Sequence, residues 1–268
     1  KYLVALLKRF DLLDHRFRKK IAGGIRLDLC FHDHIQRQIL WYGHYEQKEL
    51  QLAAKLIPEN GVVIDAGANF GYHSFWFSRF CPRGSVHAFE PSPLPWEQLI
   101  SHLSLNRSAT IHPHRMALDA VNGEQAFYAA KQDNTGMGGF VDTGNASGMV
   151  VQVPCIRLDD FISENGIASV DLVKIDVEGA EIRALKGMTH MLQVTRPIIL
   201  VECSIATLAF HGEKLSDLYG LLGGFGYLPF EAVDGCTLRK VREAKELSLA
   251  FFLPRERVEL IKNIRIEN

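Results

Sequence analysis

Four short apolar segments of the sequence each carry an acidic residue at or near their end. These residues are Asp65, Glu90, Asp176 and Glu202. If the segments are parallel strands of one sheet, their carboxyl ends meet at a single edge, where open α/β sheets bind ligands. Four carboxylates at one edge predict a crevice that attracts cations and binds hydroxyl groups.

The turn after the first segment, within VVIDAGANFGY at 62–72, favours one class of ligand. A dinucleotide needs the spacing Gly-x-Gly-x-x-Gly, because a helix N-terminus must meet its pyrophosphate. Here three residues separate Gly67 from Gly71, and the second glycine of that fingerprint is absent. Asp65 precedes the turn, and an acid there disfavours a pyrophosphate and favours the positive charges of S-adenosylmethionine. The turn therefore fits S-adenosylmethionine better than NAD, although Asp-x-Gly turns also occur as plain structural turns.

Glu90 ends the second segment, 19 residues after Gly71. An acid at about this position commonly accepts hydrogen bonds from ribose hydroxyls. The alternative is a solvated residue at a strand end. Pro91 and Pro93 follow, and because proline cannot continue a central strand, the strand is expected to stop at Glu90.

Lys174 and Asp176 lie two residues apart and therefore share one face of their strand. A lysine inside a covered strand is costly unless it is paired. One interpretation is a buried structural ion pair with Asp176, Glu178 or Glu202. The other interpretation is a cation or base positioned near the substrate, and the sequence leaves both open.

The elements that must position these residues alternate along the chain. The predicted strands are apolar runs of four to six residues, at 62–66, 86–90, 171–176 and 198–203. The helical stretches between and after them are 72–80, 93–106, 179–193 and 211–223. This alternation predicts an α/β fold with a doubly wound, mostly parallel sheet. Further strands are predicted at 124–130 and 150–156, and an antiparallel pair at 226–233 and 247–253.

Composition limits the class of protein. The 268 residues are 47% apolar, which excludes global disorder, and their length suits one large α/β domain. The 30 basic residues balance 31 acidic ones, which argues against nucleic acid as a partner. No apolar run approaches the length needed to cross a bilayer. The five scattered cysteines form no CxxC pair, so we expect neither a zinc knuckle nor a redox pair, and a reduced, cytoplasmic compartment.

The N-terminal part is expected to be a helical extension and lead-in, 1–57, to a main domain at 58–268. Residues 1–20 have helically spaced apolar residues with seven basic and two acidic ones, and 45–57 reads as a second helix. An amphipathic helix packed on the main domain is the favoured interpretation of 1–20. Peripheral contact with a membrane surface, or with a partner, is the alternative.

Three segments of the chain resemble the FkbM family of methyltransferases. They are VVIDAGANFGYHS, HAFEPSP and VDLVKIDVEGAEIRALKG, of which the last is the most specific. The stretch RQILWYGHYEQKE and the C-terminal FGYLPFEAVDG are also similar to that family. The resemblance spans about residues 30–253.

The resemblance implies a class I methyltransferase fold, Rossmann-like, with a seven-stranded sheet that ends in an antiparallel hairpin. It implies S-adenosylmethionine as cofactor and O-methylation of a sugar, glycan or natural product, so the expected partner is a small-molecule or glycan acceptor. The implied cofactor-binding residues are Glu46, Asp65, Gly67, Ala68, Asn69, Gly71, Tyr72, Glu90, Pro91, Asn106, Ala117, Leu118 and Asp176. Among them the glycine turn would surround the methionine part, Glu90 the ribose, and Asn106 with 117–118 the adenine side.

A hydroxyl acceptor needs a base or a metal to raise its nucleophilicity. The candidate catalytic residues are Lys174, Asp176, Glu202 and His211. His211 could titrate near neutrality, but a surface or helix-capping histidine is at least as good an interpretation. No His/Asp/Asn ligand spacing specifies a metal, so we predict none, although Asp176 and Glu202 could hold a divalent ion.

The segment 131–149 is rich in Gly, Asn, Asp and Ser, and its length as a loop suggests a functional role. Asn134, Thr135, Met137 and Glu178 are the candidate acceptor contacts, and a merely flexible loop is the rival interpretation. Two other functions remain open: an NAD-linked oxidoreductase, and a binding protein that keeps the fold without catalysis. The sequence fixes neither the acceptor nor the oligomeric state.

Overall fold

A nine-stranded mixed sheet organises the molecule in the computed structural model, which describes residues 13, 15–106, 110–130, 138–142, 144 and 146–267. In sequence order the strands are β3 (Val62–Ala66), β4 (Ser85–Phe89), β5 (Ile111–His114), β9 (Leu172–Ile175), β10 (Ile198–Cys203), β11 (Tyr227–Asp234), β12 (Thr237–Lys240), β13 (Leu247–Pro254) and β14 (Arg265–Glu267). Their spatial order is β14-β12-β11-β13-β10-β9-β3-β4-β5.

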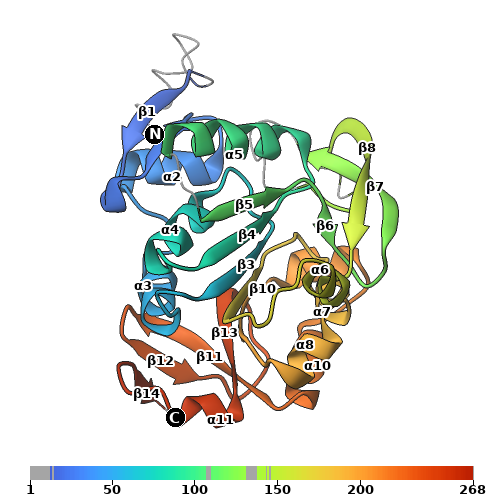
Figure 1. The fold of residues 1–268 in the computed structure, drawn as a ribbon. Helices are drawn as coiled ribbons and strands as arrows, with labels where there is room; N and C mark the ends of the chain where they lie inside the picture. Colours follow the sequence, from blue (N-terminus) through green and yellow to red (C-terminus); the bar gives the residue numbers. More distant parts are fainter. Residues whose placement is uncertain are drawn as a thin grey trace.

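The parallel part of this sheet reverses direction at its centre. From β3 the chain moves outward through β4 to β5, and it then returns to the other side of β3 with β9 and β10 (Figure 1). The edge between the ends of β3, β4 and β9 is therefore the switch point where doubly wound sheets bind ligands. The predicted strands at 62–66 and 198–203 are confirmed with the same bounds.

The C-terminal strands run against the parallel part. β13 pairs antiparallel with β10, and β11 pairs antiparallel with β13. The sheet has nine strands where the resemblance implies seven, because β12 and β14 extend it beyond β11. These two strands have only four and three residues, too few to show a hydrophobic period.

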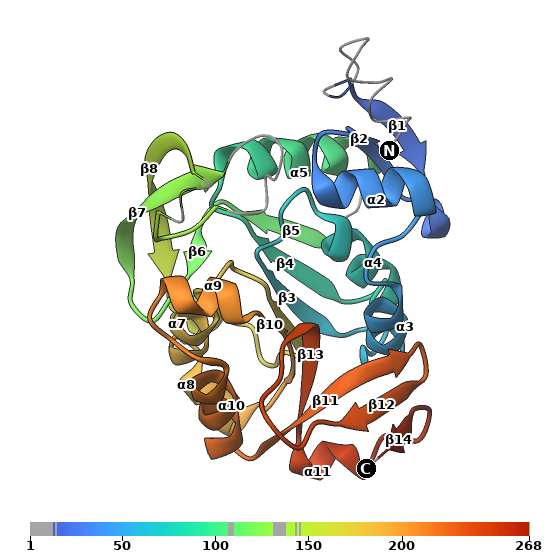
Figure 2. The same ribbon diagram turned by 180° about the vertical axis from the view of Figure 1, so that it is seen from behind.

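Helices cover both faces of the sheet. On one face lie α2 (His34–Tyr42), α3 (Gln47–Leu56), α4 (Tyr72–Phe80) and α5 (Pro93–Asn106); on the other lie α6 (Leu158–Glu164), α7 (Glu181–Lys186), α8 (Thr189–Val194) and α10 (Leu215–Gly224) (Figures 1 and 2). Neighbouring residues of β3 alternate between the two cores, since Val63 joins the first and Ile64 the second. The sheet is thus covered as a doubly wound fold requires.

The helix predicted over 179–193 is divided in two, α7 and α8. The interruption falls at Gly187, where a Cβ would overlap the carbonyl oxygen of Asp119. The helix predicted over 211–223 begins four residues later, because His211 caps the preceding α9 (Ile205–Phe210). The helices predicted at 72–80 and 93–106 are confirmed with the same bounds.

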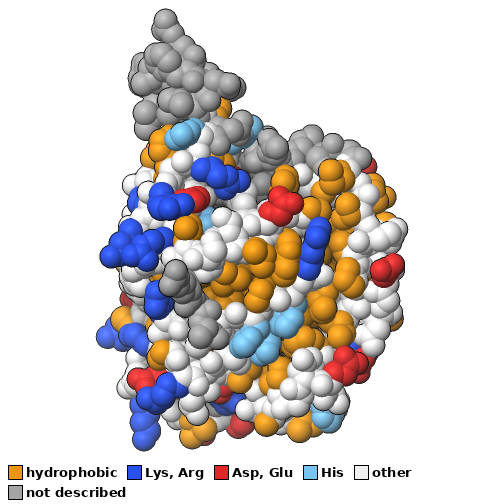
Figure 3. Space-filling model, turned by 45° about the horizontal axis from the view of Figure 1, so that its top comes forward, with side chains coloured by type: hydrophobic (Ala, Val, Ile, Leu, Met, Phe, Trp, Pro, Cys, Tyr) orange, Lys and Arg blue, Asp and Glu red, His pale blue; other side chains and the backbone are white. Residues whose placement is uncertain are grey.

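The N-terminal segment contains a β-hairpin. β1 (Phe17–Lys20) pairs antiparallel with β2 (Arg26–Leu29) across the short η1 (Ala22–Gly24), so the helix predicted over 1–20 is wrong for its last four residues. Residues 1–12 and 14 of that prediction lie outside the described residues. Buried side chains of β2 and α3 join the same core as those of β3 and α4. Figure 3 shows lysine and arginine side chains gathered on the side of the molecule where β1 and α3 lie.

A small second sheet stands beside the main one. It has the order β6-β8-β7, with β6 (Ala117–Leu118), β7 (Gly123–Ala130) and β8 (Ala146–Ile156), and it confirms the predicted strands at 124–130 and 150–156 (Figure 1). One short helix, α11 (Arg255–Val258), follows β13. Within the described residues, no helix has the length and apolar character that a membrane span requires.

Candidate active site

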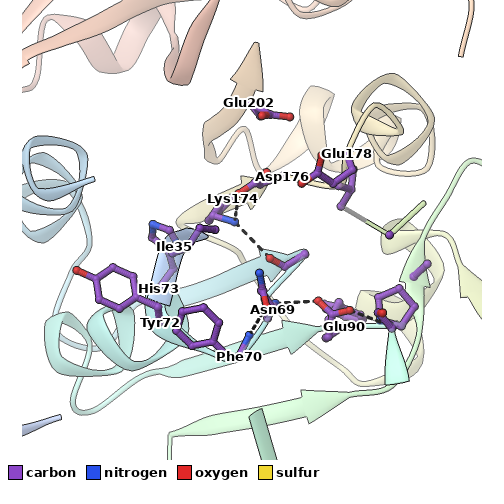
Figure 4. A pocket seen from close by; sticks show the side chains of 18 of the residues that line it. Ile35, Asn69, Phe70, Tyr72, His73, Glu90, Lys174, Asp176, Glu178 and Glu202 are labelled. Atoms are coloured by element: carbon purple, nitrogen blue, oxygen red, sulfur yellow. Dashed lines mark hydrogen bonds and ion pairs between the residues drawn. The ribbon is translucent and has the colours of Figure 1, made fainter. Parts of the chain in front are cut away.

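A cleft opens at the carboxyl ends of β3, β4, β9 and β10. Together with its open mouth it holds about 1050 Å³, and its walls also include residues of α2, β6, β7 and β13. Figure 4 shows Glu202, Asp176 and Glu178 toward one end of the cleft and Glu90 toward the other. The sequence-predicted residues that line it are Glu46, Gly67, Ala68, Asn69, Tyr72, Glu90, Pro91, Ala117, Leu118, Lys174, Asp176, Glu178 and Glu202.

The glycine turn after β3 is fixed between two neighbouring strand ends. The backbone N–H groups of Gly67 and Ala68 donate to the carbonyl oxygen of Phe89 over 3.0 and 2.9 Å. Gly67 has a φ of 75°, and a Cβ at this position would overlap the carbonyl oxygen of Asp176. Only glycine therefore allows β3 and β9 to end this close together and leaves backbone exposed to a ligand.

Glu90 lies where a ribose-binding acid is expected. The residue is 5% exposed, and its two carboxylate oxygens accept hydrogen bonds from the backbone N–H groups of Asn69 and Ser92, both over 2.8 Å (Figure 4). A carboxylate can accept about four hydrogen bonds, so this orientation leaves capacity for the hydroxyls of a ligand. Burial raises the pKa of Glu90 to about 7.

Lys174 is a buried cation beneath the turn. It is 1% exposed, and its Nζ lies 3.2 Å from Oδ2 of Asp176, 3.5 Å from Oδ1 of Asp65 and 3.5 Å from the carbonyl oxygen of Gly67. Burial lowers the pKa of the Lys174 ammonium, but Asp176 and Asp65 outweigh burial and hold that pKa above its usual value. The geometry thus bears out the structural ion pair between Lys174 and Asp176. It also places the Lys174 ammonium at the end of the cleft that contains Asp176.

Asp65 stands behind the cleft wall. It is fully buried, it accepts a hydrogen bond of 2.5 Å from the Ser74 hydroxyl, and it does not line the cleft. The prediction that Asp65 contacts a bound ligand directly is therefore wrong. Asp65 holds Lys174 and the first turn of α4 in place.

Two carboxyl groups beside Asp176 favour their protonated forms. Burial and the nearby charge of Asp176 raise the pKa of Glu202 to about 10 and that of Glu178 to about 8. The Thr207 hydroxyl donates to Glu202 over 3.4 Å. This end of the cleft therefore combines one ion-paired carboxylate with two carboxyl groups that can donate hydrogen bonds.

Glu46 closes the same end from the opposite side. It adopts a left-handed φ of 45°, its Oε2 lies 3.0 Å from Nε2 of His73, and its Oε1 accepts a hydrogen bond from the Ser248 hydroxyl. Burial alone raises the pKa of the Glu46 carboxyl, but His73 and Ser248 outweigh burial and lower it. Beside it, the Tyr72 hydroxyl donates to the carbonyl oxygen of Tyr45 and accepts from its N–H.

The end of the cleft beyond Glu90 is apolar. Ala117 and Leu118 of β6 are buried there, and the rings of Phe127 and Phe140 meet edge to face with centroids 5.5 Å apart. A planar apolar ring would find contact surface at this end, whereas a charged group would not.

The structure places three other predicted residues, Gly71, Asn106 and His211, outside the lining of the cleft, and Gly71 caps the start of α4. Asn106 ties α5 to β2 through two hydrogen bonds of 2.8 Å with the backbone of Arg26, so its predicted place near adenine is wrong. His211 packs behind the turn at Gly179 and does not line the cleft, which removes it as the base. Asn134, Thr135 and Met137 lie outside the described residues.

Several residues of the cleft were not singled out from the sequence. They come from loops and from strands distant along the chain, or they are plain apolar residues: Ile35, Tyr45, Phe70, His73, Phe89, Ser92, Phe127, Gly138, Phe140, Val177 and Ser248. Gly138 and Phe140 belong to the glycine-rich segment at 131–149, whose composition was the one available signal.

The donor set of the cleft fits S-adenosylmethionine. A turn with exposed backbone and an acidic end would hold the methionine part, Glu90 the ribose and the apolar end the adenine. Within the described residues, no group of three or more His, Cys, Asp or Glu side chains is arranged to hold a metal ion.

Comparison with known proteins identifies the family of the chain. The family model "Methyltransferase FkbM domain" matches residues 65–229, more than half of the chain. The chain therefore belongs to the FkbM methyltransferase family.

Characterised relatives match over part of their length. The chain is 28% identical over 155 residues to "Hexuronic acid methyltransferase AglP" of Haloferax volcanii, covering 58% of this chain and 61% of that protein. It is 29% identical over 153 residues to "31-O-demethyl-FK506 methyltransferase FkbM" of Streptomyces tacrolimicus, covering 47% and 59%. The crystal structure of an FkbM methyltransferase from Methylobacillus flagellatus superposes with a TM-score of 0.48 at 15% identity, covering 73% of this chain and 44% of that one. The chain spans about three fifths of the length of the curated relatives it matches.

Proposed function

We propose that the chain is a class I, S-adenosylmethionine-dependent O-methyltransferase that acts on a hydroxyl of a sugar, glycan or natural product. The observation that carries the proposal is the order of groups along the cleft, from the Asp176 end through Glu90 to the apolar end. This order repeats the order of methionine, ribose and adenine in the cofactor. Membership of the FkbM family supports it, as do relatives named for O-methylation of hydroxyl-bearing compounds.

The chain's own residues would orient the acceptor and receive its proton. When bound, S-adenosylmethionine supplies a methyl group on a positively charged sulfur, which needs no further activation. Asp176 is the carboxylate at that end, held by Lys174, and it would accept the hydrogen of the acceptor hydroxyl. Glu202 and Glu178, as proton-bearing groups, would fix the remaining oxygens of the acceptor. Much of the rate would come from holding the hydroxyl in line with the methyl group.

Binding of S-adenosylhomocysteine to Glu90→Gln tests the cofactor assignment. Loss of a charge-assisted hydrogen bond of about 1.5–3 kcal/mol predicts roughly 10- to 100-fold weaker binding in calorimetry. The matched control is Glu97→Gln, an exposed position on the neighbouring α5, which should bind as the parent chain does. Melting temperatures should show that both variants fold.

NAD serves as the competing ligand in the same experiment. A ligand that binds only the folded state raises the melting temperature. We expect S-adenosylhomocysteine to raise it and NAD to leave it unchanged. Stabilisation by NAD and none by S-adenosylhomocysteine would instead support the oxidoreductase.

A further inference from the structure

A second groove opens beside the active-site cleft, between α3, β11 and the start of β13. We call it the side groove. It holds about 1180 Å³ with its open mouth, and it shares Tyr45, Glu46 and Ser248 with the cleft. These three residues line both hollows, and we call them the shared wall.

The side groove meets the cleft at the end where the methyl group is expected. Leu247 of β13 pairs with Cys203 of β10, so Ser248 lies next to the strand end that carries Glu202. Glu90 directly follows β4, which lies three strands away from β10 across the sheet. A molecule in the side groove therefore approaches the Asp176–Glu202 end and not the ribose end.

The shared wall contains a buried acid with unused hydrogen-bonding capacity. The Glu46 side chain is only 9% exposed, and its left-handed backbone is a conformation that non-glycine residues rarely adopt. Its Oε2 is close to His73 but forms no hydrogen bond among the described residues. Strained residues of this kind cluster at ligand contacts.

The lining of the side groove suits hydroxyl groups. The ring of Tyr42 is 67% exposed and offers an apolar face, and the amides of Gln38, Gln47 and Gln51 can both donate and accept hydrogen bonds. This combination of a flat ring with amide groups matches the alternating apolar and hydroxyl faces of a sugar.

The charge of the side groove opposes an anion. Four of its lining residues are acidic, and Lys48 is the one lysine or arginine among them. The Lys48 ammonium already donates to the carbonyl oxygen of Ala232 over 2.9 Å and lies 3.6 Å from Glu49. Glu231 is compensated by Lys245 and Arg239, which leaves no free lysine or arginine for a carboxylate or phosphate ligand within the described lining.

We infer that the side groove binds the methyl acceptor, and that the acceptor presents an uncharged, hydroxyl-rich unit such as a neutral sugar, not an acidic sugar. This inference rests on the proposed methyltransferase function. It adds a location and a charge class for the acceptor.

The test measures binding of defined glycosides to the chain saturated with S-adenosylhomocysteine. The probes are methyl glycosides of glucose, mannose and rhamnose, with the methyl glycoside of glucuronic acid as the acidic counterpart, followed by saturation-transfer NMR. We expect the neutral glycosides to bind and Tyr42→Ala to weaken them about fivefold, as roughly 1 kcal/mol of lost ring contact predicts. Phe210→Ala is the matched control, because Phe210 is also an exposed aromatic residue but lines neither hollow.

A second variant tests the charge argument directly. Gln47→Arg adds a cation to the exposed first turn of α3, and it should allow the glucuronide to bind. Equal binding of the glucuronide and the neutral glycosides to the parent chain would overturn the inference, and so would unchanged binding in Tyr42→Ala. If the chain binds S-adenosylhomocysteine but none of the neutral glycosides, only this inference is overturned. If the chain fails to bind S-adenosylhomocysteine, the proposed function is overturned as well.

Discussion

Removal of the Lys174 ammonium should destabilise the fold far more than removal of an exposed lysine. In Lys174→Met, the fully buried Asp65 keeps, among the residues that the structure describes, only the Ser74 hydroxyl as a hydrogen-bond partner. Breaking a buried ion pair from one side costs about 3–5 kcal/mol, because a charge is left buried without compensation. Since domains are stable by roughly 5–15 kcal/mol, this loss is a large fraction of the total. Urea unfolding followed by circular dichroism measures it.

Two comparisons make this prediction specific. Lys186→Met is the control, because Lys186 is 54% exposed and its ion pair with Glu213 spans 3.6 Å, so we expect a loss below about 1 kcal/mol. The double variant Lys174→Met/Asp65→Asn removes both charges and should regain most of the loss. Equal losses for the two lysine variants would refute the reasoning.

Three further results are expected. Gly67→Ala should fold poorly and lose S-adenosylhomocysteine binding in calorimetry, because its Cβ overlaps the backbone of Asp176, whereas Gly220→Ala, which has open space, should bind normally. Burial raises the pKa of Glu178 from 4.5 to about 8, so between these pH values the folded state holds a proton that the unfolded chain has released. The free energy of unfolding should therefore fall as pH rises across this window. In Glu178→Gln, the urea concentration at the unfolding midpoint should depend less on pH. In a thiol-reagent assay, Cys236 should react at once in the native protein, and the buried Cys30, Cys81, Cys155 and Cys203 only on unfolding.

The sequence predicted the covered strands and their helices well, for a physical reason. Residues 62–66, 72–80 and 93–106 are bounded by Gly or Pro and have one dominant period, so local and tertiary preferences agree. The β1–β2 hairpin was missed because the helix predicted from the apolar residues upstream was extended into 17–20. The structure of that segment depends on its pairing with β2 and on the burial of Leu27 and Leu29 in the core. Both are tertiary interactions that local spacing does not show.

The site was predicted where strand order alone decides it. Glu90 and Gly67 follow from the position of their strand ends, and both line the cleft. Asp65 was assigned to the ligand from its strand end, Asn106 from the family resemblance and His211 from its place in a loop after a strand. None of these signals gives the direction of the side chain. The sequence also could not predict contacts that only the folded chain brings together. The hydrogen bond between Ser248 and Glu46, which are 202 residues apart, is an example.

The position of Lys174 explains why so many acids can share one sheet edge. Without a cation, carboxylates this close together would keep protons rather than charges, as the raised pKa values of Glu178 and Glu202 show. Lys174 forms ion pairs with Asp65 and Asp176 and so places a cation beside these two acids. One buried ammonium therefore connects the glycine turn to the strand that carries the proposed proton acceptor. A cofactor contact at the turn and a catalytic contact at Asp176 depend on the same side chain, and substitution of Lys174 should impair both functions together.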